Sequence, residues 1–216
     1  MILKYEIQKQ LKEIYIDNIA DLHYNLGSAA LYEIAIRRRE GIISHMGPLV
    51  VRTGAHMGRS PNDKFIVKES SSEKNIWWGK VNVPIEENKY DRIYSRMMAY
   101  IQGKDIFVQD CSAGADPDYR LPIRIITETA WHSLFARNMF RQYKNEDELK
   151  NHKTEFTVIH MPNFHAKPET DGTNSNAFVI VNFGKSTVII GGTHYAGEIK
   201  KAIFTVLNYL RPLQKV

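Results

Sequence analysis

Apolar and polar positions along the chain follow helical and strand periods in turn, and the two kinds of segment are interleaved. The clearest helix is predicted over 86–102, where apolar side chains recur every three or four residues and Gly103 follows as a C′ residue. The apolar positions are Tyr90, Ile93, Tyr94, Met97, Met98 and Ile101. A tyrosine and methionine stripe with this spacing is typical of core packing rather than of a ligand site.

Three further helices are predicted, over 28–40, 128–141 and 196–210. Ser28 is placed to cap the first helix and Gly41 to end it. The second helix has Trp131, Leu134, Phe135 and Met139 on one face. The third has Ile199, Ile203, Val206, Leu207 and Leu210 on one side.

Short apolar runs between the helices predict about six to eight strands. They are IISHMGPLVV at 42–51, broken or bent at Gly47-Pro48, then KFIV, DIFVQD, LPIRIIT, FTVIH, AFVIVNF and TVIIGG. AFVIVNFGKSTVII predicts a hairpin, because Gly184-Lys185 separates two apolar runs. Together these elements predict an α/β fold in which helices flank a mixed β-sheet.

Composition limits the kinds of partner and compartment to expect, but it does not determine the function. The chain has 216 residues, 43% of them hydrophobic, a net charge of +5 and a pI of about 9.1, which favours anionic partners. Its cations are scattered, and no RRM, KH or helix-turn-helix pattern supports a nucleic-acid-binding module. A single cysteine, Cys111, excludes an intramolecular disulfide and fits a reducing compartment. With no secretory h-region and no apolar run of about 18 residues, a cytoplasmic protein without a membrane segment is expected.

The densest anion-binding chemistry is TGAHMGRSPNDKFIV, residues 53–67. Gly54 and Gly58 allow positive φ and a close approach of a ligand to the backbone. Arg59 offers a fork of donors that suits a carboxylate or phosphate. Asp63 is placed to orient Arg59 or to pair with the following lysine. The alternative is a structural glycine turn with a locally paired arginine, and the spacing of a P-loop is absent.

A second candidate is VIIGGTHYAGEIKKAIF, 188–204, where a strand ends at a glycine pair and a helix begins within a few residues. Free backbone N–H groups at a helix start attract an anion. Tyr195 adds a hydroxyl, and Lys200 and Lys201 follow about one turn later. The alternative for both lysines is a solvated helix face.

Two other polar stretches are open to more than one interpretation. Residues 109–140 carry Asp110, Asp116, Asp118, Arg120 and Arg124, which form either an ion-pair network or a binding rim. His132 is expected to be packed or hydrogen-bonded, since no His or Cys pair here has zinc spacing. The loop 161–178 contains His165 and Asp171, which carry no signal alone.

These motifs, in order, resemble the N-terminal half of ATP-dependent phosphoenolpyruvate carboxykinase from about residue 25 to 210. The residues that carry the resemblance are TG-x-x-x-GRSP-x-DKFIV, QD…GADP-x-YRL…R-x-ITE-x-AWHSLFARNMF, P-x-F-x-A-x-PE-x-DGT and GGT-x-YAGE-x-KK-x-IF…NYL. The resemblance implies a helical extension over 1–24 and a substrate-binding, carboxykinase N-terminal domain over 25–216.

The resemblance also implies an activity. Such enzymes are gluconeogenic carboxy-lyases that convert oxaloacetate and ATP to phosphoenolpyruvate, ADP and CO2, with Mg2+ and a second cation, usually Mn2+. Arg59 is similar to the arginine that holds the substrate carboxylate or CO2, and Tyr195 to the tyrosine beside the substrate. Lys201 resembles the lysine that ligates Mn2+ and contacts substrate and nucleotide phosphate, and Lys200 is its neighbour.

Two departures qualify these expectations. Met57 and Asn62 replace the threonine and lysine usual in the family's substrate loop. The family's P-loop, metal-binding histidine and aspartate follow the motif at 188–204, whereas this sequence stops at RPLQKV. It is therefore expected to be an isolated N-terminal domain, inactive alone, with a C-terminal half as its missing partner. The alternative is a non-catalytic remnant that binds small dicarboxylates.

Overall fold

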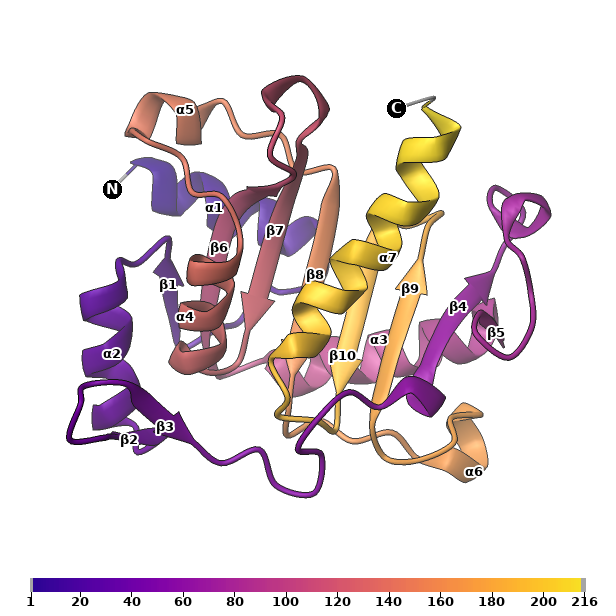
Figure 1. The fold of residues 1–216 in the computed structure, drawn as a ribbon, viewed down its shortest axis with the longest axis horizontal. Coiled ribbons are helices and arrows are strands. Elements are labelled where there is room, and N and C mark those ends of the chain that lie inside the picture. Colours follow the sequence, from indigo (N-terminus) through magenta and orange to yellow (C-terminus); the bar gives the residue numbers. More distant parts are fainter. Residues whose placement is uncertain (1, 215–216) are drawn as a thin grey trace.

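A computed structural model describes residues 2–214. Its centre is an eight-stranded sheet flanked by helices (Figure 1). In spatial order the strands are β1 (Asp21–Tyr24), β6 (Asp105–Ala113), β7 (Leu121–Thr127), β8 (Phe156–Met161), β10 (Thr187–Gly191), β9 (Phe178–Asn182), β4 (Lys64–Lys68) and β5 (Val83–Glu86). The run at 42–51 forms a separate hairpin of β2 (Gly41–Ile43) and β3 (Leu49–Val51).

The sheet is mixed, as the sequence predicts. β6 pairs with β7 and β9 with β10 in antiparallel fashion, and the other neighbours are parallel. The predicted hairpin is β9–β10, and the residue with positive φ in its turn is Ser186, at 46°, rather than a glycine. The α/β class with a mixed sheet is confirmed.

Helices cover both faces of the sheet. They are α1 (Ile2–Glu13), α2 (Ser28–Arg37), α3 (Glu87–Ile101), α4 (Ala130–Met139), α5 (Glu146–Lys150), α6 (Pro168–Asp171) and α7 (Gly197–Leu213). Three short 3-10 turns are η1 (Pro61–Asp63), η2 (Glu73–Asn75) and η3 (Pro117–Tyr119). Figure 1 shows α4 and α7 in front of the sheet and α1 and α3 behind it.

Successive side chains of each strand point to opposite faces of the sheet and so contribute to two separate cores. In β4, Phe65 and Val67 pack in the core under α1 and α3, whereas Ile66 packs on the opposite face under α7. The stripe predicted on α3 is that core contact, since only Tyr94 of its six members is not fully buried. α3 ends before Gly103, whose φ is 75°.

Two expectations about helix details are wrong. The N-cap of α2 is Gly27 and not Ser28, which is the first helical residue and caps nothing with its side chain. The same helix ends at Arg37, three residues before the predicted end. On α4, Met139 shares a face with Trp131 and Phe135, as the sequence predicts, and it is 39% exposed. It follows Trp131 and Phe135 at four-residue intervals and, with them, faces a pocket described below.

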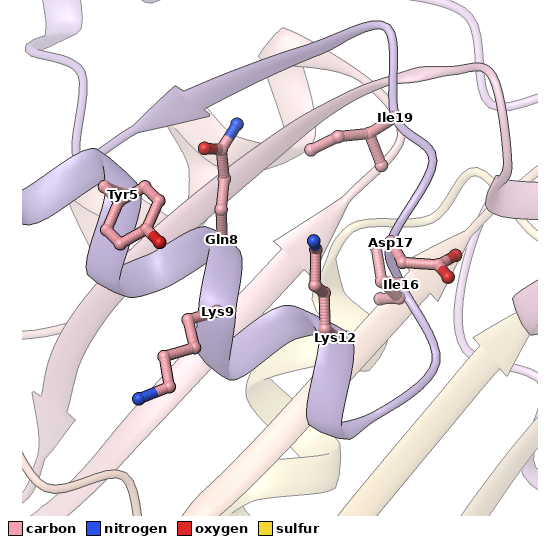
Figure 2. A pocket seen from close by; sticks show the side chains of 7 residues that line it. All are labelled: Tyr5, Gln8, Lys9, Lys12, Ile16, Asp17 and Ile19. Atoms are coloured by element: carbon pink, nitrogen blue, oxygen red, sulfur yellow. The ribbon is translucent and has the colours of Figure 1, made fainter.

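α1 packs on the same core as the sheet, because Ile7 and Leu11 are buried there. The proposed boundary between 1–24 and 25–216 therefore separates segments that share a core, and it stays a prediction. Beside α1 lies a shallow pocket, and Figure 2 shows its lysines, Lys9 and Lys12, pointing in different directions. Among the described helices, none has the length and apolar character needed to cross a membrane.

Candidate functional site

A pocket of about 400 Å³ lies between the 53–59 loop, α4 and the start of α7. Arg59, Lys200 and Lys201 line it, so the structure brings together the cations of the two candidate motifs. Tyr195 lines it as well. The remaining wall residues are Thr53, Trp131, Phe135, Met139, Ala196 and Gly197.

The lining gives this pocket an anion-binding character. Three cationic side chains and no carboxylate line it within residues 2–214. Apolar and aromatic walls reduce the local dielectric and thereby strengthen the attraction of an anion by those cations. The Lys201 ammonium lies 5.3 Å from the centre of the Phe204 ring, one turn later on α7. The pocket therefore suits a small molecule with negative charge at one or both ends.

Glu198 joins the Arg59 loop to α7. Its Oε1 accepts a 2.8 Å hydrogen bond from the backbone N–H of Ser60, although the two residues are 138 positions apart. Glu198 is 5% exposed, and burial raises the pKa of its carboxyl. The Ser60 amide and the charges of Arg59 and Lys64 oppose that rise. The carboxylate is therefore used inside the scaffold and does not enter the pocket.

A second link to α7 starts from Lys64. Its ammonium donates a 2.5 Å hydrogen bond to Thr205 Oγ1, and burial lowers the pKa of this lysine. Asp63 does not fill the expected role beside Arg59 or Lys64. It accepts a 2.9 Å hydrogen bond from Ser175 Oγ and so ties the loop to the segment before β9.

The conformation of the loop fits only part of the sequence prediction. Gly54 has a φ of 67°, as expected, whereas Gly58 is not among the residues with positive φ. Ser60 Oγ lies 2.9 Å from His56 Nδ1. Met57 is 83% exposed and lies outside the pocket lining. Its replacement of threonine therefore removes a hydroxyl from a position that does not face the pocket.

Close backbone approaches fix the position of Tyr195. A Cβ on Gly197 would lie 2.5 Å from Tyr195 Cε1, so the ring rests where only glycine leaves room. Gly192 has a φ of 68°, and a Cβ there would lie 2.3 Å from the Asn176 carbonyl oxygen. The Tyr195 amide donates a 3.1 Å bond to Thr193 Oγ1. The glycines that suggested an anion site thus serve to place the tyrosine.

His132 is buried and hydrogen-bonded, as the sequence predicts. Its Nδ1 lies 2.5 Å from Thr129 Oγ1, and its Nε2–H donates to the His194 carbonyl over 3.0 Å. His160, which is not predicted from the sequence, is fully buried on β8 and donates from Nε2 to the Thr193 carbonyl over 2.8 Å. The only signal for it was a polar residue inside an apolar strand run.

The buried charged residues of the two other polar stretches build scaffold outside the pocket. Asp110 and Arg124 are cross-strand partners in β6 and β7 and form a buried ion pair with two 2.7 Å bonds. Of the two alternatives, the ion-pair network is the one observed for this pair. In the 161–178 loop, Asp171 is fully buried and accepts from Arg96 over 2.7 Å at both oxygens.

The described residues supply few ligands for a metal ion. No group of three or more His, Cys, Asp or Glu side chains that could hold a metal occurs within residues 2–214. Lys201 offers a nitrogen at the pocket, but a single amine does not make a site for Mn2+ or Mg2+. The described residues alone therefore do not fit a metal centre.

Comparison with known proteins gives a family. The sequence profile of phosphoenolpyruvate carboxykinase matches residues 20–216. A phosphoenolpyruvate carboxykinase (ATP) of Geotalea uraniireducens is 58% identical over 202 residues, which are 94% of this chain and 38% of the relative. One from Thermus thermophilus is 50% identical over 196 residues, 89% of this chain and 37% of the relative.

One from Bacillus pumilus is 46% identical over 215 residues, 99% of this chain and 39% of the relative. The chain thus spans somewhat over a third of the length of the relatives it matches. The profile covers nearly the whole chain, and it includes the Arg59 loop, the two buried histidines and the start of α7. This chain belongs to the ATP-dependent phosphoenolpyruvate carboxykinase family.

Proposed function

We propose that this chain supplies the substrate-binding half of an ATP-dependent phosphoenolpyruvate carboxykinase and that its pocket takes oxaloacetate or phosphoenolpyruvate. The observation that carries the proposal is the convergence of Arg59 and Lys201 on one pocket from two distant segments. Both ligands are small molecules with two or more negative charges, and the pocket combines three cations with apolar walls. The family relationship supplies the reaction.

Each side chain has a role that follows from its chemistry. Arg59 presents paired N–H donors, which match a carboxylate in a bidentate arrangement. Lys201 adds a compact positive charge to the pocket lining, next to Lys200. Tyr195 adds an aromatic ring and a hydroxyl to the same lining. Together they orient the substrate and exclude water from it.

The proposed reaction has two steps. Cleavage of the C–C bond to the leaving carboxylate releases CO2 and leaves its electron pair on the remaining fragment as an enolate. The enolate oxygen then attacks the γ-phosphorus of ATP, and ADP departs with the electrons of the broken P–O bond. Lys201 and Arg59 stabilise the negative charge that develops in both steps.

Binding of phosphoenolpyruvate to the purified chain tests the proposal, with isothermal titration calorimetry as the measurement. We expect weak binding, with a Kd on the order of 1 mM, since a few charge-assisted contacts supply about 4 kcal/mol. Arg59→Ala abolishes the heat signal. Arg52→Ala is the matched control, because Arg52 is exposed on the same loop and does not line the pocket. Equal affinities of the wild type and Arg59→Ala contradict the proposal.

Turnover is measured separately. ATP-dependent formation of phosphoenolpyruvate from oxaloacetate, followed with the chain alone, distinguishes a complete catalyst from a binding domain. We expect no turnover above background, because the proposal assigns nucleotide binding to a C-terminal half. Binding without turnover is also the outcome expected of a non-catalytic dicarboxylate-binding domain. Activity on adding that half separates the two, since only the proposed enzyme gains turnover.

A further inference from the structure

Two buried imidazoles hold consecutive carbonyl groups directly before Tyr195. His160 Nε2 lies 2.8 Å from the Thr193 oxygen and His132 Nε2 lies 3.0 Å from the His194 oxygen. Both histidines are fully buried, and their rings are 4.3 Å apart in an edge-to-face arrangement. They come from β8 and α4, whereas the carbonyls belong to the segment between β10 and α7.

The acceptors determine the tautomer of both rings. A carbonyl oxygen only accepts, so each Nε2 carries its proton. In neutral His132 the Nδ1 lone pair then accepts from the Thr129 hydroxyl, at 2.5 Å. His160 Nδ1 has no hydrogen-bond partner among residues 2–214. Protonation there would add a buried, unpaired N–H beside another imidazole, which opposes the charged form.

Holding these two carbonyls restricts the direction in which the chain enters Tyr195. The C=O of one residue and the N–H of the next belong to the same planar peptide group. A carbonyl held in place therefore restricts the orientation of that whole group. The Thr193 and His194 carbonyls set the two planes that lead from Thr193 to the Tyr195 nitrogen. Beyond it, Gly197 leaves the space that the tyrosine ring occupies. The position of the Tyr195 ring therefore depends on the two held carbonyls before it and on the space at Gly197 after it.

We propose that His132 and His160 are positioning residues, which as neutral Nε2–H donors hold the Thr193–His194 backbone and thereby orient Tyr195 toward the substrate pocket. The purpose of that orientation rests on the function proposed above. Neither histidine lines the pocket, so both act through Tyr195 and not by touching the substrate.

The first test uses the unmodified chain and no ligand. Long-range proton–nitrogen NMR spectra of the ¹⁵N-histidine-labelled protein distinguish the imidazole tautomers. Signals are assigned from single histidine substitutions. We expect Nε2–H tautomers for both His132 and His160 at pH 7. An Nδ1–H tautomer or a charged ring at either position overturns the proposal, because the carbonyl contact then loses its donor or gains an unpaired charge.

The second test follows Tyr195 itself by ¹⁹F NMR of the 3-fluorotyrosine-labelled chain. Its signal is identified by its loss in Tyr195→Phe, and Tyr90 in the opposite core serves as the internal reference. Glutamine retains an amide donor at a position similar to Nε2, whereas leucine does not. We expect the Tyr195 signal to shift or broaden in His160→Leu and His132→Leu and to stay near wild type in the glutamine variants. An unchanged Tyr195 signal in a folded leucine variant contradicts the proposal.

Phosphoenolpyruvate binding gives the functional readout. Loss of one donor is expected to weaken binding about fivefold in each leucine variant, the size of one hydrogen bond. In a Tyr195→Ala background the same substitution is expected to have no further effect, because the coupling runs through the tyrosine. Equal fivefold losses in both backgrounds contradict the proposal. If the wild type binds nothing, the function proposed above fails, while the tautomer and the Tyr195 signal still decide the positioning.

Discussion

The backbone N–H of Ser60 donates a 2.8 Å hydrogen bond to the Glu198 carboxylate and so fastens the loop that carries Arg59 to the helix that carries Lys201. Glu198 is buried, and its carboxylate lies inside the scaffold, between the loop and α7. The segments that carry Arg59 and Lys201 are consequently held together by a contact that neither cation makes. Removing this contact is expected to affect binding without removing a pocket residue.

Glu198→Ala is expected to weaken phosphoenolpyruvate binding about tenfold and to lower the free energy of unfolding by about 1–3 kcal/mol. It leaves the half-buried Ser60 N–H without its acceptor. Glu198→Gln retains an acceptor oxygen and is expected to lose less affinity and less stability than Glu198→Ala. Calorimetry and urea denaturation supply the two quantities, with Glu155→Ala as an exposed control. Unchanged affinity in a folded Glu198→Ala variant would show that the link does not position Arg59.

Gly197→Ala tests the space beside Tyr195. The added methyl group would lie 2.5 Å from Tyr195 Cε1, so the ring must move. Phosphoenolpyruvate affinity is expected to fall severalfold while the melting temperature stays near wild type, because alanine is tolerated at the first turn of a helix. Gly79→Ala is the control, since nothing lies within 4 Å of its added Cβ. A normal affinity in Gly197→Ala would mean that the ring position is unimportant.

Stability is expected to fall as the pH is lowered from about 6.5 toward 4. Burial lowers the pKa of His160 from 6.5 to about 4, so in this window the unfolded chain takes up a proton that the folded chain does not. His160→Gln removes that difference. Urea denaturation at pH 6.5, 5.5 and 4.5 should give a pH slope shallower in the variant by about 1.4 kcal/mol per pH unit. Parallel slopes would show that His160 is protonated in the folded state.

The buried ion pair between β6 and β7 is expected to dominate the stability of that edge of the sheet. Asp110→Asn leaves Arg124 with an uncompensated buried charge and is expected to cost about 3–5 kcal/mol in urea denaturation. The control is Asp147→Asn, which breaks an exposed pair with Lys150 and is expected to cause no measurable change. Similar, small effects of both substitutions would contradict the structural role assigned to Asp110.

Most of the fold could be predicted from hydrophobic periodicity. The α3 stripe and the β9–β10 hairpin were recoverable because burial of one face imposes a regular period. Helix ends were less predictable. Ser28 is a good N-cap residue type, yet Gly27 takes that position, and Glu40 supplies acceptors to the first amides of α4 from elsewhere in the chain. A contact between distant segments, such as this one, cannot be predicted from the local pattern of residue types along the sequence.

The pocket-lining residues Arg59 and Lys201 could be predicted from the sequence, whereas the contacts that hold their segments in place could not. Arg59 and Lys201 stand in motifs with recognisable anion-binding chemistry, and the structure places both at one pocket. The contacts of Glu198, His132 and His160 depend on pairing across the fold. A buried histidine in a strand has the same sequence signature whether it is packed or donates to a distant carbonyl.

The double-mutant cycle of Arg59→Ala and Lys201→Ala, measured as phosphoenolpyruvate affinity, tests the central claim most directly. If both cations hold one anion, each single substitution reduces binding strongly, and the double variant is little worse than either single variant. The Arg52→Ala control binds as wild type. Wild-type affinity in either single variant would contradict the claim that Arg59 and Lys201 form one substrate site.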